Sequence, residues 1–172
     1  MTKTVIHFII LAAVLLMVQV VCNKIMLLGL AMPIVFIYVI YRLPASLHVN
    51  WVLTVAFLMG LVVDVFNDTP GMNALSCTLL AALRRPVFRA YAPRDIQEDG
   101  LLPSMAAMGT GAFFKYALTL TLFYAAVLFL IQAFTLRDWL LTVERIAASA
   151  ALSMVLILGI DSLVDTGHGE GL

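Results

Sequence analysis

The sequence predicts an all-α polytopic membrane protein with six transmembrane helices. Of its 172 residues, 63% are hydrophobic and 12% are charged, whereas about 25% of residues are charged in ordinary soluble domains. Ten basic and ten acidic side chains cannot coat a soluble domain of this size. The composition therefore excludes a water-soluble enzyme and a disordered chain. The net charge of zero creates no field that attracts DNA, so we expect a lipid bilayer and no nucleic acid around this chain.

Six apolar runs correspond to the six predicted helices. The first lacks the small residues of a signal-peptide cleavage site, so we expect it to be retained. The second contains Pro33, which neighbouring helices in a membrane can accommodate. We interpret residues 1–164 as one transmembrane domain and 165–172 as a short flexible tail. The runs span residues 5–21, 25–41, 51–66, 71–83, 109–134 and 146–164.

The second and third runs are flanked by aromatic residues. Tyr38, Tyr41 and Trp51 surround the loop at 42–50 and fit an aromatic belt at the membrane interface. The third and fourth runs are shorter than the roughly 30 Å hydrocarbon layer. We therefore expect the polar turn at 64–71 to dip below the membrane surface, or else both helices to extend to an ordinary interface.

Basic residues predict the orientation, because cytoplasmic loops are enriched in Lys and Arg. Six spans place both termini on the same side, and the basic count favours the cytoplasm. The cluster Arg84, Arg85, Arg89 and Arg94 carries much of this bias. It either contacts anionic lipid or docks a cytoplasmic partner. Pro86 and Pro93 are expected to stop the fourth helix from continuing. With both termini inside, the inner residues are Lys3, Arg42, Arg84, Arg85, Arg89 and Arg94, against Lys24, Arg137 and Arg145 outside.

Placing a charged side chain inside a membrane span costs free energy, so each such residue in the predicted spans needs an explanation. Ala56, Gly60 and Asp64 are spaced by four residues and share one helical face. If that face packs against another helix, Asp64 points into the bundle and anchors the next turn. The alternative is that the carboxylate of Asp64 reaches the outer headgroups. Lys115 and Asp161 are predicted at similar depth and form a candidate ion pair. The alternative is that Lys115 extends alone to the headgroups.

The turn after Asp64 has the pattern of a helix start. Asp68 or Thr69 is expected to cap the free amides, and Pro70 suits the first turn. Gly71 relieves the turn or permits close packing. The oxygen ligands of Asp64, Asn67 and Asp68 match no calcium-binding loop, so we interpret this segment as structural.

Small residues line the sixth run. Ala147 and Ala151 share one face, and Ser149 and Ser153 share another. Such stripes mark close helix contacts, either within the chain or with a partner. We therefore treat Ala147 and Ala151 as a possible helix-contact face.

The chain shows no pattern of catalytic residues. His7, His48 and His168 lack the spacing of metal ligands, and no nucleophile elbow, phosphate loop or catalytic carboxylate pair is present. Cys22 and Cys77 are interpreted as small core residues. We expect no enzymatic activity, cofactor or metal.

The segment at 57–74 resembles the signature of MreD, the rod shape-determining family; its sequence is FLMGLVVDVFNDTPGMNA. Two later segments resemble the Bacteroidetes-type members of that family. They are LRRP at 83–86 and APRD at 92–95. The resemblance implies a bacterial inner-membrane component of the peptidoglycan elongation machinery that binds MreC, and directly or through it MreB, RodA and a class B penicillin-binding protein. It also implies a fold similar to the substrate-binding subunits of energy-coupling-factor transporters. The signature residues are Gly60, Asp64, Asn67, Asp68, Pro70, Gly71 and Ala74.

Two functions stay open at this point. The first is a non-enzymatic membrane scaffold that binds MreC and helps to position peptidoglycan synthesis. The second is a small-molecule (vitamin-type) binding subunit of a transporter. That alternative requires a pocket that opens outward near the polar turn at 64–71.

Overall fold

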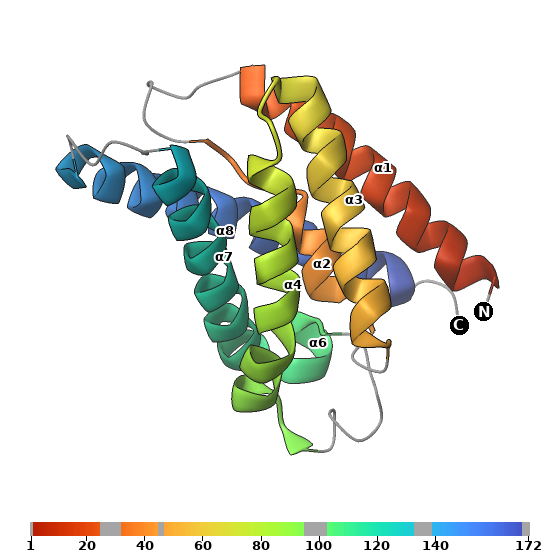
Figure 1. Ribbon diagram of the computed structural model, residues 1–172. Coiled ribbons are helices and arrows are strands. Elements are labelled where there is room, and N and C mark those ends of the chain that lie inside the picture. The colour runs from red at the N-terminus through yellow and green to blue at the C-terminus, as the bar shows by residue number, and fades with distance from the viewer. Residues whose placement is uncertain (1, 25–31, 45–46, 95–102, 133–138, 170–172) are drawn as a thin grey trace.

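The computed structural model describes residues 2–24, 32–44, 47–94, 103–132 and 139–169, and every regular element within these ranges is a helix (Figure 1). The predicted all-α class is therefore confirmed. In chain order the helices are α1 (Thr2–Lys24), α2 (Ile37–Arg42), α3 (Val49–Asn67), α4 (Met72–Tyr91), α6 (Met105–Met108), α7 (Thr110–Gln132) and α8 (Trp139–Gly169).

Three helices are long and apolar enough to cross a membrane. They are α3, α7 and the Thr142–Val164 part of α8, and α1 contributes a shorter apolar stretch at Phe8–Val21. Helix α3 has 19 residues, or about 28 Å at 1.5 Å per residue. Their length and composition are consistent with an all-α membrane protein. Helix α8 continues to Gly169, beyond the predicted end of the sixth span.

The prediction of one continuous helix over 25–41 is wrong at residues 32–35. Residues 25–31 lie outside the described ranges, and residues 32–35 have no helical structure. A helix resumes only at Ile37 and ends at Arg42. Pro33 has no N–H to donate, and its ring disfavours helix in the residue before it. The segment is therefore extended, and its backbone groups bond to side chains of other helices.

The prediction that Pro86 stops the fourth helix is also wrong. Helix α4 runs through Pro86 to Tyr91. Neighbouring helices can support a helix around the one missing hydrogen bond. The helix ends where Ala92 becomes extended, as expected for a residue that precedes a proline. Pro93 thus has the role that the sequence suggested for both prolines.

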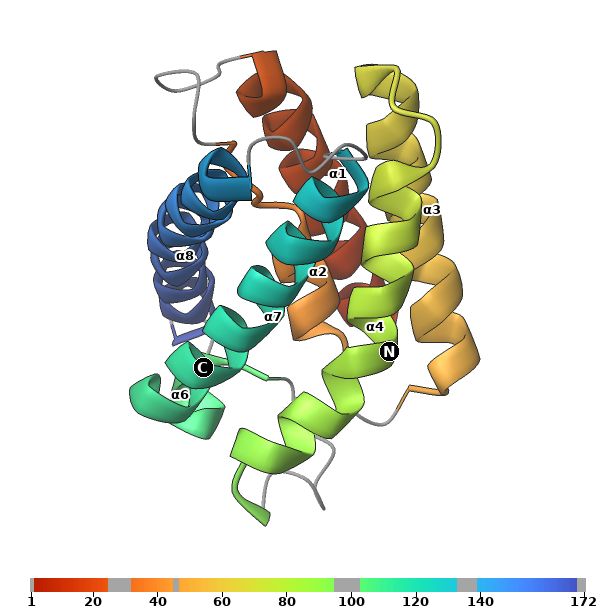
Figure 2. The ribbon, with the colours of Figure 1, turned by 60° about the vertical axis from the view of Figure 1, so that its left-hand side comes forward.

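The helices pack around α2. Helix α4 lies between α3 and α7, α8 packs on the other side of α7, and α1 packs on α3 (Figures 1 and 2). All six residues of α2 are buried. Tyr38 and Tyr41 are therefore core residues, not members of an interfacial belt. Trp51, which is 67% exposed, keeps the predicted position on the surface.

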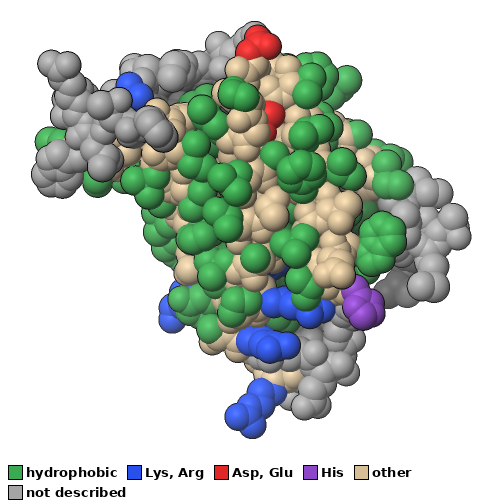
Figure 3. Space-filling model, viewed as in Figure 1, with side chains coloured by type: hydrophobic (Ala, Val, Ile, Leu, Met, Phe, Trp, Pro, Cys, Tyr) green, Lys and Arg blue, Asp and Glu red, His purple; other side chains and the backbone are tan. Residues whose placement is uncertain are grey.

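The outer surface has an apolar middle and charged ends. In Figure 3 hydrophobic side chains cover the middle of the visible face, most Lys and Arg side chains gather below it, and acidic side chains lie at the upper end. The upper end contains the α3–α4 turn and the lower end contains the last turns of α4 (Figure 1). This banding is typical of a protein whose middle faces lipid.

Candidate functional site

Asp64 joins the end of α3 to the start of α4. Its Oδ2 accepts the backbone N–H of Ala74 at 2.8 Å, and its Oδ1 accepts the backbone N–H of Asn73 at 3.0 Å and the side-chain amide of Asn73 at 2.9 Å. The hydroxyl of Thr69 donates to the same Oδ1 at 2.7 Å. The carboxylate is buried. It therefore satisfies amides of the first turn of α4 that have no partner within that helix.

The cap of α4 corrects one prediction from the sequence. Asp68 and Thr69 were expected to cap this helix, but its N-cap residue is Gly71, which makes no side-chain cap. Asp64 supplies the cap from the preceding helix instead. The prediction that Asp64 points into the bundle agrees with its burial and its four hydrogen bonds.

The turn between α3 and α4 depends on left-handed backbone. Asp68 has φ +53° and Gly71 has φ +77°. Asp tolerates this region better than most side chains do, and Gly adopts it without steric cost. Pro70 lies between them, so residues 68–71 reverse the chain within a few residues. Gly71 thus has the role in the turn that was predicted for it.

Gly60 brings the two helices into direct backbone contact. A Cβ atom at Gly60 would lie 2.6 Å from the Cα of Ala74 and 2.6 Å from the carbonyl oxygen of Asn73. Ala56, one turn earlier on the same face, is fully buried. The face formed by Ala56 and Gly60 therefore packs inside the chain and offers no docking surface for another protein.

Asn73 extends this unit to α7. The hydroxyl of Tyr124 donates to Asn73 Oδ1 at 2.7 Å, and both side chains are buried. Neither residue was among the predicted site residues. The signal that could have identified Asn73 is its position beside Ala74, just after the polar turn at 64–71. The α3–α4 unit is thus hydrogen-bonded to the long apolar helix α7.

The extended segment at 32–35 is held by three polar side chains. Gln19 of α1 donates to the carbonyl oxygen of Pro33 at 2.9 Å and accepts the N–H of Val35 at 2.8 Å. Ser149 of α8 accepts the N–H of Met32 at 3.0 Å, and Ser153 accepts the N–H of Ile34 at 2.8 Å. Irregular backbone at membrane depth is tolerated only when protein or water satisfies it. The serine face of α8 therefore supports the backbone within this chain.

Gln19 was not predicted as a site residue. Its signal in the sequence is a single amide side chain inside the apolar run at 5–21. Ala147 and Ala151, on the neighbouring face of α8, are exposed. The structure thus separates the two stripes of α8, since one contacts the extended segment and the other lies on the surface.

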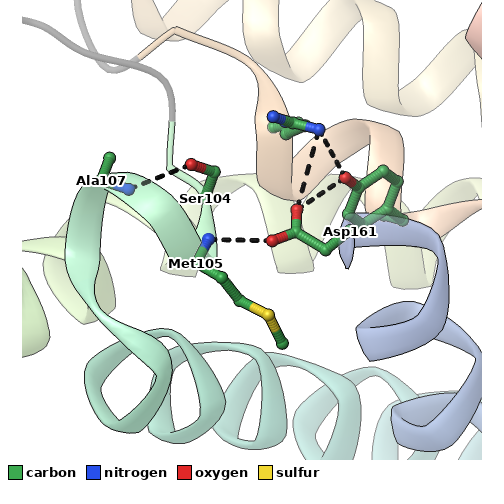
Figure 4. A network of polar contacts seen from close by, with 6 residues as sticks. Ser104, Met105, Ala107 and Asp161 are labelled. Carbon is green, nitrogen blue, oxygen red and sulfur yellow. Dashed lines mark hydrogen bonds and ion pairs between the residues drawn. The ribbon is translucent and has the colours of Figure 1, made fainter. Parts of the chain in front are cut away.

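Asp161 lies in a polar network in the C-terminal half of α8 (Figure 4). Its Oδ1 accepts the hydroxyl of Tyr38 at 2.6 Å and lies 3.8 Å from Arg42 Nη1. Arg42 also donates to Tyr38 Oη at 2.8 Å. Asp161 Oδ2 accepts the backbone N–H of Met105 at 2.8 Å. The carboxylate joins α8 to α2 and to the start of α6.

The predicted ion pair between Lys115 and Asp161 is wrong. Asp161 is fully buried and pairs with Arg42, whereas Lys115 is exposed on α7. A buried carboxylate needs a charged or donor partner close by. Arg42 reaches Asp161 because α2 lies in the centre of the bundle, which the sequence pattern did not reveal.

The predicted basic cluster is divided between the core and the surface. Arg84 is 3% exposed and donates to the carbonyl oxygen of Leu43. Arg85 donates to the carbonyl oxygen of Leu47 at 2.6 Å, and both Arg89 and Arg94 are exposed. Arg84 therefore fixes the chain after α2, and Arg89 and Arg94 lie on the surface at and just after the last turn of α4.

A cavity of about 240 Å³ lies between α1, the extended segment, the α3–α4 turn and α7. Gln19, Asn73 and Tyr124 line it together with Asn67 and Asp68 of the predicted signature. It is adjacent to the α3–α4 turn, and that turn lies at the opposite end of α4 from Tyr91 (Figure 1). The signature therefore forms both a helix junction and part of a cavity wall.

Within the described ranges, no three His, Cys, Asp or Glu side chains gather as a metal ion would require. Cys77 is buried and carries a free thiol, whereas the side chains of Cys22, His7 and His168 lie outside the described part. Comparison with protein-family models, curated proteins and solved structures gives no match.

Proposed function

We propose that this protein is a non-enzymatic scaffold of the MreD type in the bacterial inner membrane, which binds MreC and helps to position peptidoglycan synthesis. The observation that carries the proposal is the unit formed by the signature residues. Gly60 and Ala74 are in backbone contact, and Asp64 caps α4. A segment that resembles one family and also forms a specific helix junction is a stronger indication than the resemblance alone.

The proposed topology has six crossings with both termini in the cytoplasm. Three apolar helices and the banded surface support membrane insertion. The basic end around Arg89 and Arg94 favours the cytoplasmic side under the positive-inside rule. The α3–α4 turn would then face the periplasm.

Thiol labelling in intact cells tests this orientation. In a chain whose Cys22 is replaced by Ser, Asp68→Cys should react with a membrane-impermeant maleimide and Arg94→Cys should react only after lysis. Cys77 is buried and serves as a low background. The reverse pattern would refute the orientation.

The surface proposed to bind MreC is the exposed alanine face of α8. Ala147 and Ala151 are one helical turn apart and both are exposed, and small residues let a second transmembrane helix approach closely. The Ala56–Gly60 face is occupied by α4, so it is not proposed. RodA, MreB and the penicillin-binding protein are proposed to associate directly or through MreC.

Copurification and cell shape together test the scaffold. Ala151→Leu should lower the recovery of MreC from detergent extracts and fail to restore rod shape in depleted cells. Ala82→Leu, at an exposed position of α4, is the matched control and should behave as wild type. Failure of the wild-type protein to recover MreC would contradict the proposal.

One observation favours the second function, a small-molecule binding subunit of a transporter. That function requires a pocket near the turn at 64–71, and the cavity beside Asn67 and Asp68 lies there. Tight vitamin binding by the purified protein, with normal cell shape after depletion, would favour this function over the scaffold.

A further inference from the structure

The last turns of α4 carry two guanidinium groups beside the start of α3. Arg85 donates from Nη2 to the carbonyl oxygen of Leu47 at 2.6 Å, and Leu47 directly precedes the N-cap residue of α3. Arg89 follows four residues later, on the same face of α4, and its side chain is exposed. A guanidinium has five N–H donors, so Arg85 can bind an anion while it keeps its bond to Leu47.

The surroundings of these two groups are positively charged. Residues 47–51 and 82–94 contain four arginines and no Asp or Glu. The acids at 95–99 lie outside the described residues, and over 84–99 as a whole the arginines still outnumber them. This end of α4 therefore attracts an anion.

An exposed apolar stripe leads along α4 to the arginines. Leu75, Leu79 and Pro86 are spaced by four and seven residues, so they lie on one face of the helix. Arg89 lies three residues beyond Pro86, on the same face. Leu75 is 50% exposed, Leu79 is 41% exposed and Pro86 is also exposed. The outward face of α4 is thus apolar along most of its length and cationic at its end.

The length of this face matches one leaflet of a bilayer. Leu75 and Arg89 are fourteen residues apart, or about 21 Å along the helix axis. Half of a bilayer with its headgroups is about 20–23 Å thick. Trp51, in the first turn of α3, is 67% exposed, as is typical of aromatic residues at headgroup level. The arginines therefore lie at the depth of lipid phosphates when Leu75 lies near the bilayer centre.

We propose that the outward face of α4 binds an anionic phospholipid, with its phosphate at Arg85 and Arg89 and an acyl chain along Leu75, Leu79 and Pro86. Guanidinium groups bind phosphate oxygens in pairs, which makes arginine well suited to this contact. Of the two roles that the sequence left open for the arginine cluster, this assigns the lipid. The inference goes beyond the proposed scaffold, which concerns the surface of α8, and it holds for either candidate function.

Two lipids with the same acyl chains test the proposal. Dioleoylphosphatidylglycerol is anionic and dioleoylphosphatidylcholine is zwitterionic. Native mass spectrometry of the purified full chain in nonionic detergent should show saturable one-to-one binding of the anionic lipid, at least fivefold tighter than that of the zwitterionic lipid. Glycerol phosphate carries the anion without acyl chains and should not displace the lipid at equal concentration. The titration needs no MreC, so failure here leaves the scaffold proposal intact.

Variants locate the binding. Arg89→Gln should weaken the anionic lipid about fivefold, the change that corresponds to about 1 kcal/mol for one basic residue near the membrane surface, and should leave the zwitterionic lipid unaffected. Arg145→Gln removes the same charge from an exposed position on α8 and should bind as wild type. Circular dichroism checks that each variant keeps its helices.

Three results would overturn the proposal. Equal affinity for the two lipids would leave the arginines to an acidic protein partner. Displacement by glycerol phosphate at equal concentration would assign them to a free anion. Unchanged affinity of Arg89→Gln for the anionic lipid would place the lipid elsewhere. If Arg89→Gln fails to fold, the two lipids and glycerol phosphate on the wild-type protein still decide the outcome.

Discussion

Replacing Gly60 with alanine should destabilise the junction of α3 and α4. The new Cβ would lie 2.6 Å from the Cα of Ala74 and 2.7 Å from its backbone nitrogen. Backbone atoms cannot rotate away as a side chain can, so one helix must shift. A shift of Ala74 also lengthens its 2.8 Å hydrogen bond to Asp64.

The magnitude follows from two opposing effects. Alanine favours helix over glycine by about 1 kcal/mol. Overpacking a close contact costs about 1–3 kcal/mol, and weakening a hydrogen bond to a charged group adds about 1.5–3 kcal/mol if the bond is lost. We therefore expect the free energy of unfolding to fall by up to about 2 kcal/mol if the hydrogen bond to Asp64 survives, and by about 1.5–5 kcal/mol if it is lost.

Gly159→Ala in α8 is the matched control. No atom lies within 4 Å of a Cβ built at Gly159, so only the helix preference remains and stability should rise by up to about 1 kcal/mol. Both variants are measured by denaturant unfolding of the detergent-solubilised protein, followed by helical circular dichroism. Equal stabilisation by the two alanines would refute the close packing of α3 on α4.

Three further substitutions test the buried polar contacts. Asp64→Asn turns an amide donor toward backbone N–H groups and should cost about 2–3 kcal/mol of unfolding free energy; a loss below 0.5 kcal/mol would contradict the cap. Ser153→Ala leaves the N–H of Ile34 without its acceptor and should cost about 1–3 kcal/mol, measured by the same unfolding titration, and unchanged stability would show that the segment is held differently. Asp161→Asn should lower the melting temperature whereas Lys115→Gln should have little effect, and the double variant should show additive effects; strong coupling would restore the rejected ion pair.

Local hydropathy predicted the class of the protein and several elements. The runs at 51–66 and 109–134 correspond to α3 and α7, because a long apolar stretch in a helix satisfies its own backbone in lipid. The spacing of Ala56, Gly60 and Asp64 predicted one buried face, since residues four apart in a helix lie on the same side. These features depend on residues that are near in sequence.

Tertiary structure decided where the chain is not helical and which charges meet. The extended segment at 32–35 is stable because Gln19, Ser149 and Ser153 bond to its backbone, and the serines are more than one hundred residues away in sequence. Asp161 pairs with Arg42 across a similar separation. Such pairings depend on how helices pack in space, and hydropathy and spacing along one helix carry no information about the partner helix.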